Sequence, residues 1–206
     1  MLTSIMEQLM NGLRTGSIYA LIALGYTMVY GIAKMINFAH GDIIMVGAYT
    51  LYIGIALLHL PVIAAMLLTA VVCSVLGVLI EKIAYKPLRN APPLAVLITA
   101  IGMSYFLQSV ALLIFSSTPI PFKSVINLDS VQVGSVNISG ITIVTLVVTT
   151  AIMVALTLFI NKTKAGSAMR AVSEDRGAAE LMGINVNGTI SMTFAIGSAL
   201  AAVAGI

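Results

Sequence analysis

Hydrophobic residues occur along the chain in long runs that short polar segments separate. A helix needs roughly 20 mostly apolar residues to cross the hydrocarbon core of a bilayer. About six runs approach that length, a number consistent with a membrane-embedded bundle. They cover residues 9–32, 38–58, 61–80, 94–115 and 141–160, and a last run begins near Gly188. The pattern therefore predicts an all-α fold, a polytopic transmembrane helical bundle.

The composition excludes a soluble domain. Hydrophobic residues make up 60% of the 206 positions and charged residues 8%, whereas soluble domains carry about 25% charged residues. The net charge is +3, but the basic residues lie in short segments between the apolar runs, which is typical of a lipid-embedded protein rather than of one that binds nucleic acid. We also expect no removable signal peptide, because no small-residue cleavage site follows a short apolar core.

Basic residues concentrate in two segments, 81–92 and 161–187, which two predicted spans separate. Both therefore fall on one side, which the positive-inside rule assigns to the cytoplasm. Counting spans back places the amino terminus outside. Prolines punctuate residues 81–92, so we expect this segment to be a loop in water.

The longest loop on the opposite side runs over residues 116–140 and contains Lys123 and Asp129. Within it, residues 131–133 and 136–138 alternate apolar and polar side chains around Gly134-Ser135. A glycine that opens a two-residue connection is typical of a β-hairpin turn. The pattern predicts a small external hairpin.

Residues 161–187 are predicted to contain one short amphipathic helix that ends at Gly183. Arg170 and Glu174 are four residues apart and share one face, while Met169, Val172, Ala179 and Met182 fall near another. Such a helix can dock into a groove of a partner protein or lie on lipid headgroups. Both interpretations remain open from amphipathicity alone.

Asn37, His40 and Asp42 lie between the first two spans. Polar groups near a membrane interior face a cavity or a partner, and we expect them to hold a helix break in which Asn37 and Asp42 satisfy freed backbone groups. Contact with a transported substrate is the less favoured alternative. His40 has no second metal-ligating side chain at a suitable spacing, so we expect a hydrogen-bonded core residue and no metal.

Helix 9–32 carries two further patterns. Gly12 and Gly16 form a small-xxx-small pair that favours close approach of another helix. Tyr19, Tyr26 and Tyr30 fall on roughly one face, where they either line a pathway or hydrogen-bond between packed helices.

No nucleotide-binding loop or catalytic set of side chains is present in the sequence. The chain is therefore not expected to be an enzyme or to bind a cofactor.

Two sets of residues resemble known permeases. The run Asn11–Gly31, the motif Asn37-Phe-Ala-His-Gly-Asp42 and Gly47-Ala-Tyr49 resemble the branched-chain amino acid permeases of the LivH type, a family of binding-protein-dependent ABC importers. Gly177-Ala-Ala-Glu-Leu-Met-Gly183 resembles the coupling motif of ABC importer permeases, with Gly177 where that motif usually has Glu.

The resemblance implies a permease subunit of the bacterial cytoplasmic (inner) membrane that imports leucine, isoleucine and valine. It implies a second homologous permease subunit, two cytoplasmic ATP-binding subunits that hydrolyse ATP, and a periplasmic or extracellular substrate-binding protein. Residues 161–187 would be the coupling loop. Its expected coupling residues are Arg170, Glu174, Asp175, Ala178, Ala179 and Gly183.

Two alternatives remain open at this point. The chain could be a urea or short-amide permease of the same family, or a channel or secondary transporter that works without ATPase partners. In each case we expect residues 1–206 to form one transmembrane domain. Because the sequence stops inside an apolar run, we expect that domain to be incomplete at its carboxyl end.

Overall fold

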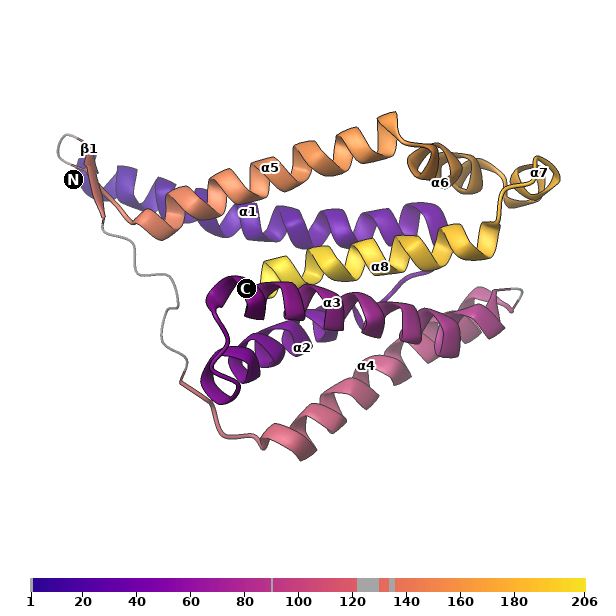
Figure 1. Ribbon diagram of the computed structural model, residues 1–206, viewed down its shortest axis with the longest axis horizontal. Coiled ribbons are helices and arrows are strands. Elements are labelled where there is room, and N and C mark those ends of the chain that lie inside the picture. Colours follow the sequence, from indigo (N-terminus) through magenta and orange to yellow (C-terminus); the bar gives the residue numbers. More distant parts are fainter. Residues whose placement is uncertain (1, 90, 122–129, 134–135) are drawn as a thin grey trace.

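The computed structural model describes residues 2–89, 91–121, 130–133 and 136–206 (Figure 1). Most of the described elements are helices. The first half contains α1 (Leu2–Ala33), α2 (His40–Tyr52), the π-helical turn η1 (Ile53–Leu57), α3 (Val62–Ile80), the π-helical turn η2 (Glu81–Tyr85), the 3-10 turn η3 (Lys86–Leu88) and α4 (Pro93–Phe115). The second half contains β1 (Val131–Val133), β2 (Val136–Ile138), α5 (Gly140–Lys162), α6 (Lys164–Glu174), α7 (Arg176–Leu181) and α8 (Val186–Gly205).

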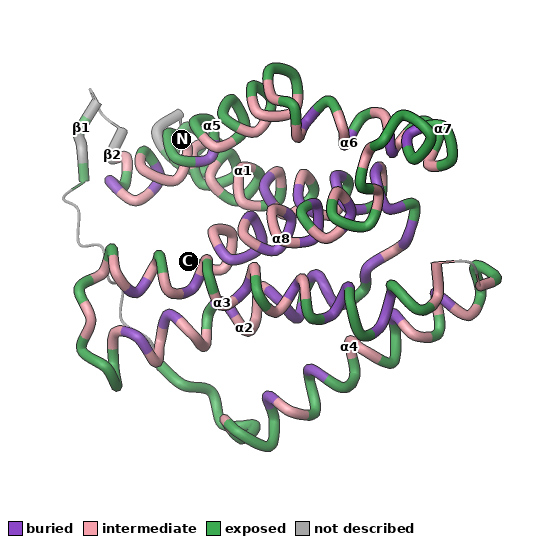
Figure 2. Tube along the Cα trace, turned by 45° about the vertical axis from the view of Figure 1, so that its right-hand side comes forward, coloured by how far each residue is buried: buried purple, intermediate pink, exposed green. Residues whose placement is uncertain are grey.

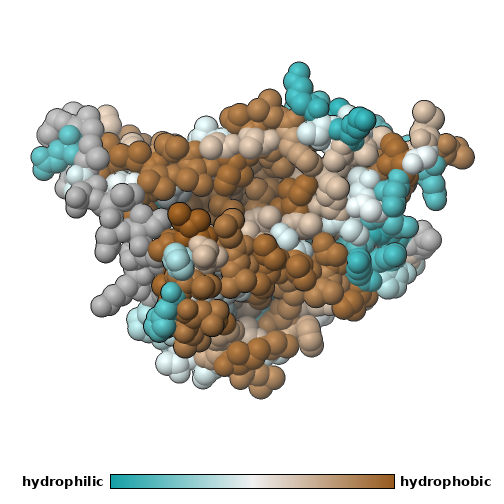
Figure 3. Space-filling view, viewed as in Figure 1, coloured by the Kyte–Doolittle hydropathy of each residue, from teal (hydrophilic) through white to brown (hydrophobic). Residues whose placement is uncertain are grey.

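Six helical segments of the described chain are long and apolar enough to cross a membrane. They correspond to α1, α2 with η1, α3 with η2 and η3, α4, α5 and α8. Apolar side chains cover the middle of the molecule, and hydrophilic ones gather towards its two ends (Figure 3). The predicted polytopic bundle is confirmed.

Helix α8 occupies the centre of the bundle, where it packs against α1, α2 and α3 (Figure 1). Half of its most apolar window is buried, compared with 6% for α5, and Figure 2 shows the same contrast along the two helices. Glycines allow the close crossings. A Cβ on Gly25 of α1 would lie 3.0 Å from the carbonyl oxygen of Gly197 in α8, and one on Gly77 of α3 would lie 1.9 Å from Ser198 Oγ.

The predicted close approach at Gly12 and Gly16 is wrong for the described part of this chain. A Cβ at either position would meet no atom of another element within 4 Å. The small-residue pattern is present there, but α8 crosses α1 nearer its other end, at Gly25.

The segment predicted to be a loop in water is also largely helical. η2 and η3 continue α3 as far as Leu88, and the side chains of Glu81 and Tyr85 are fully buried. Ile80 and Ala84 are buried on the same stretch, so the inward-facing side of α3 extends past the first charged residue. Pro87 lies in the first turn of η3, where a proline is tolerated, and Pro92 precedes the start of α4.

The predicted hairpin is confirmed as an antiparallel pair of strands. Val131 faces Ile138 and Val133 faces Val136 in the register of β1 and β2. The predicted Gly134-Ser135 turn lies outside the described residues, as do Lys123 and Asp129.

Candidate functional site

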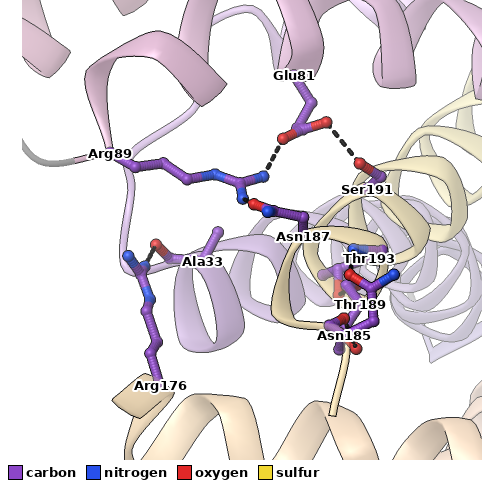
Figure 4. Close-up of polar contacts among 10 residues, drawn as sticks. Ala33, Glu81, Arg89, Arg176, Asn185, Asn187, Thr189, Ser191 and Thr193 are labelled. Atoms are coloured by element: carbon purple, nitrogen blue, oxygen red, sulfur yellow. Dashed lines mark hydrogen bonds and ion pairs between the residues drawn. The ribbon is translucent and has the colours of Figure 1, made fainter. Parts of the chain in front are cut away.

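The two basic segments meet at one end of the bundle, which we call the basic end. It comprises η2, η3, the loop before α4, and α6 and α7. Arg89, from the first segment, donates a hydrogen bond to the Asn187 side chain at the start of α8 (Figure 4). Arg176, from the second, donates to the carbonyl of Ala33, the last residue of α1. The prediction that both segments lie on one side is confirmed.

Glu81 is the centre of a polar cluster at this end. One carboxylate oxygen pairs with Arg89, and the other accepts a hydrogen bond of 2.6 Å from Ser191 Oγ in α8 (Figure 4). The Glu81 side chain is 0% exposed and that of Arg89 is 11% exposed. Buried charges require such partners, because burial removes the water that would otherwise solvate them. The cluster therefore fastens the end of α3 to α8.

Helix α6 folds back against the end of α5. Thr163 caps its first turn by accepting a hydrogen bond of 3.0 Å from Gly166 N, and a Cβ on Gly166 would lie only 2.2 Å from the carbonyl oxygen of Ile160. Arg170 donates to that same carbonyl. Because the main-chain carbonyls at a helix end lack partners within the helix, the arginine supplies one and ties α6 to α5.

The apolar face expected to dock or to rest on lipid is mostly turned inward. Met169 and Val172 of α6 are 0% and 1% exposed, and Ala179 of α7 is 3% exposed. These side chains pack into the core of the chain itself. Of the predicted apolar face only Met182 remains outside, at 82% exposed.

Two helices are present where one was predicted. Asp175 adopts an extended backbone, with φ −148° and ψ 115°, between α6 and α7. Its carboxylate then accepts hydrogen bonds from Gly177 N at 2.8 Å and Ala178 N at 3.1 Å. Aspartate is a preferred residue at this capping position because it satisfies main-chain N–H groups that lack partners within the helix. The side chain stops one helix and starts the next.

Helix α7 projects beyond the ends of α5 and α8 (Figure 1). Its last residue, Leu181, is 90% exposed. Gly183 then reverses the chain with φ +80°, and Ile184 N donates to the Ala179 carbonyl at 3.0 Å. A positive φ favours glycine at this position. The turn leaves Leu181 and Met182 as an apolar tip on the outside of the protein.

Arg176 joins α7 to the membrane helices. A positive side chain at the carboxyl end of α1 is favourable for the helix dipole. Partial burial lowers the pKa of Arg176, and the nearby positive charge of Arg89 lowers it further.

The structure places the predicted coupling residues in different settings. Arg170 bonds to α5, Asp175 caps α7, Ala179 is buried and Gly183 forms the turn, whereas Glu174 and Ala178 are exposed. Arg170 and Glu174 share a face but form no ion pair in the described part of the chain.

The predicted helix break lies between Ala33 and His40. Asn37 is buried and accepts a hydrogen bond of 3.0 Å from the Tyr85 hydroxyl. Asp42 is buried and accepts one of 2.9 Å from Gln108 Nε2 in α4. The chain is interrupted where a break was expected, and within the described structure Asn37 and Asp42 bond to side chains of η2 and α4.

His40 is a core residue, as predicted. It is 3% exposed and packs edge-on against Tyr26, with ring centroids 6.0 Å apart. Tyr19 and Tyr30 differ from Tyr26, because they are 66% and 50% exposed. The three tyrosines therefore share a helix face without sharing an environment.

Sequence reasoning missed the cluster of Glu81, Arg89, Asn187 and Ser191. One signal was available, since an acidic residue that ends an apolar run eight positions before an arginine can pair with it at the membrane edge. Nothing in the sequence indicated that Asn187 and Ser191, over 90 residues later, complete the cluster.

Comparison with known proteins places these features in a family. Residues 8–206 match the family described as branched-chain amino acid transport system, permease component. The high-affinity branched-chain amino acid transport system permease protein BraD of Pseudomonas aeruginosa is 46% identical, and the LivH permease proteins of Escherichia coli K12 and Salmonella typhimurium are 44% and 43% identical. Each alignment covers 98% of this chain and 69% of the relative. No solved structure matches the chain.

The six membrane-spanning segments agree with this match over almost the whole chain. The protein is a multi-pass membrane protein that belongs to the family of branched-chain amino acid transport permeases.

Proposed function

We propose that this chain is the membrane-spanning permease subunit of an ATP-driven ABC importer for leucine, isoleucine and valine, and that residues 161–187 are its coupling loop. The observation that carries the proposal is the apolar tip of α7. Leu181 and Met182 are 90% and 82% exposed at the basic end, where the positive-inside rule predicts cytoplasm rather than lipid.

An exposed apolar tip on a short helix is suited to a hydrophobic groove of a partner. In this proposal the groove belongs to a cytoplasmic ATP-binding subunit. Three connections would carry movement of the ATP-binding subunit into the membrane. Arg176 of α7 bonds to the end of α1, Arg170 of α6 bonds to the end of α5, and the chain continues from α7 into α8. Movement of α7 would thus act on three spans together.

The proposed assembly contains a second homologous permease subunit, two ATP-binding subunits and an external substrate-binding protein. The names of the relatives support it, because they describe permease proteins of a branched-chain amino acid transport system. This chain has no nucleotide-binding motif, so ATP hydrolysis is assigned to the ATP-binding subunits.

We assign the substrate route to the helix break, with residues 1–206 acting as one transmembrane permease domain. Interrupted membrane helices border substrate sites in many transporters. Asn37, His40 and Asp42 are buried at this break, and Asp42 Oδ2 and His40 Nε2 have no hydrogen-bond partner within the described structure. Tyr26 contacts His40 from α1, and Tyr19 and Tyr30 lie on the same side of that helix.

The coupling role is tested by replacing both tip residues, Leu181→Ser with Met182→Ser, in the assembled transporter. Leu181 and Met182 are largely exposed, so the variant should insert and fold normally while its recovery of the ATP-binding subunits in pull-down and its leucine uptake fall at least tenfold. Leu58→Ser is the matched control, because Leu58 is 56% exposed at the opposite end of the bundle. Normal recovery and normal uptake by the double variant would contradict the coupling role.

The substrate is tested separately by uptake of labelled leucine in cells that lack and then regain the gene. Excess valine should block the restored uptake, and excess urea should leave it unchanged. Block by urea would instead support a short-amide permease. Uptake that an ionophore abolishes while cellular ATP stays high would support a secondary transporter.

A further inference from the structure

A cavity of about 350 Å³ lies at the basic end, between the end of α1, the start of α4 and the start of α7. It borders the helix break at Lys34 and Met35 and shares Arg176 with the proposed coupling path, but Asn37, His40 and Asp42 do not line it. Its lining is apolar where α4 forms it, which we call the apolar side, and carries three cations from the other segments. The cations are Lys34, Arg89 and Arg176, and Val96 and Leu97 belong to the apolar side.

The positive charge of the wall is only partly balanced. Glu81 pairs with Arg89, while Arg176 reaches only a main-chain carbonyl. Lys34 forms no ion pair in the described part of the chain. The Nε atom of Arg89 is buried without a hydrogen-bond partner. Three cations and one carboxylate leave a net charge of two positive charges. Burial lowers the pKa of Arg176, and repulsion from Arg89 lowers it further.

The position of the cavity relates these charges to the membrane surface. Ala33 and Pro93 are the end of one spanning segment and the start of another, so the cavity lies at the depth of the lipid headgroups. Val96 and Leu97 continue its apolar side along α4 into the membrane. A ligand that matches both the cations and the apolar side has a phosphate group attached to hydrocarbon chains.

We propose that this cavity binds the phosphodiester headgroup of an anionic phospholipid, with the phosphate near Lys34, Arg89 and Arg176 and an acyl chain along α4. Basic pockets between membrane helices on the cytoplasmic side are suited to such headgroups. A free phosphate ion has the same charge chemistry but gains nothing from Val96 and Leu97. The apolar side therefore favours the lipid.

Lys34→Asn tests the site, because it removes a lining charge and suits the backbone. Lys34 has φ +52°, a conformation that asparagine adopts more readily than most residues. The probes are phosphatidylglycerol and phosphatidylcholine, added to the delipidated full chain and counted by native mass spectrometry. One charge near the membrane surface contributes about fivefold in lipid binding. We expect phosphatidylglycerol to bind at least fivefold better than phosphatidylcholine, and Lys34→Asn to lose about fivefold of that preference.

Lys162→Asn is the matched control, because Lys162 is an exposed cation at the same end but does not line the cavity. Its preference for phosphatidylglycerol should match that of the unchanged protein. Equal losses in the two variants would overturn the site, as would equal binding of the two lipids. Displacement of the lipid by inorganic phosphate at similar concentration would show that the apolar side contributes nothing, and would overturn the lipid assignment.

Discussion

The buried pair of Glu81 and Arg89 allows a quantitative test of how α3 is held to α8. Glu81→Gln removes the carboxylate charge and keeps the shape of the side chain. The Arg89 guanidinium, which is 11% exposed, would then have no negatively charged partner. The neutral Asn187 side chain would remain as its hydrogen-bond acceptor. Removal of one member of a buried ion pair costs about 3–5 kcal/mol.

The loss of stability in Glu81→Gln should come from the unpaired charge of Arg89 and not from a change in side-chain volume. In the double variant Glu81→Gln with Arg89→Gln no uncompensated charge stays buried, so much of the destabilisation should be recovered. We expect a coupling energy of at least about 2 kcal/mol between the two positions, within the range observed for contacting residues.

The assay is reversible unfolding of the purified chain in mixed micelles, with all three variants measured under the same conditions. Lys86→Gln serves as the control, because Lys86 is exposed in the same segment and should change the free energy of unfolding by less than about 0.5 kcal/mol. A Glu81→Gln variant within about 1 kcal/mol of the unchanged protein would refute the reasoning, since the pair would then not be buried against α8 as described.

Two further substitutions test local features of the structure. Asp175→Ala should destabilise α7 by about 1 kcal/mol through loss of its cap, seen as faster hydrogen exchange of the α7 amides, whereas Asp175→Asn should retain most of the protection; equal exchange in the two variants would contradict the capping role. Gly25→Ala should cost about 1–3 kcal/mol of stability, because the added methyl group would lie 2.9 Å from the ring of His40. Gly12→Ala, which meets no neighbour within 4 Å, should be neutral or slightly stabilising in the same unfolding measurement, and a Gly25→Ala variant as stable as this one would contradict the close crossing.

Hydropathy predicted most of the secondary structure because the bilayer imposes a minimum length on each span. Spans predicted at 94–115 and 141–160 differ from α4 and α5 by at most two residues at either end. The hairpin was predictable for a similar reason, since its alternation and its central glycine are local features. The break near Asn37 was also visible, because three polar residues interrupt an apolar region.

Contacts between distant segments were not predictable in the same way. The sequence favoured Gly12, which has Gly16 four residues away, over Gly25, which has no small residue at that spacing. Only the path of α8 decides which glycine is crossed. Asn37 could have satisfied its own backbone, and its actual partner, Tyr85, is 48 residues away. The Glu81 cluster was not predicted for a further reason. A charged residue at the end of an apolar run normally indicates the start of a water-exposed loop, and the sequence did not show that Glu81 has buried partners.

The break at Asp175 could have been predicted with more weight on capping. Aspartate followed by Arg-Gly-Ala-Ala fits a helix start as well as a helix interior. Continuous amphipathicity across 166–183 favoured one helix, yet the inward face is shared by two helices that meet at this residue.

The glycine crossings of α8 have a mechanical consequence. Where backbones touch through hydrogen atoms instead of long side chains, few rotamers are available to absorb a displacement. A methyl group at Gly25 or Gly77 would lie 3.0 Å or less from atoms of α8, so the close packing leaves little room for α8 to slide past either glycine. A displacement of α8 that begins at Val186, its first residue, would therefore either move the helices packed against it or be prevented by them.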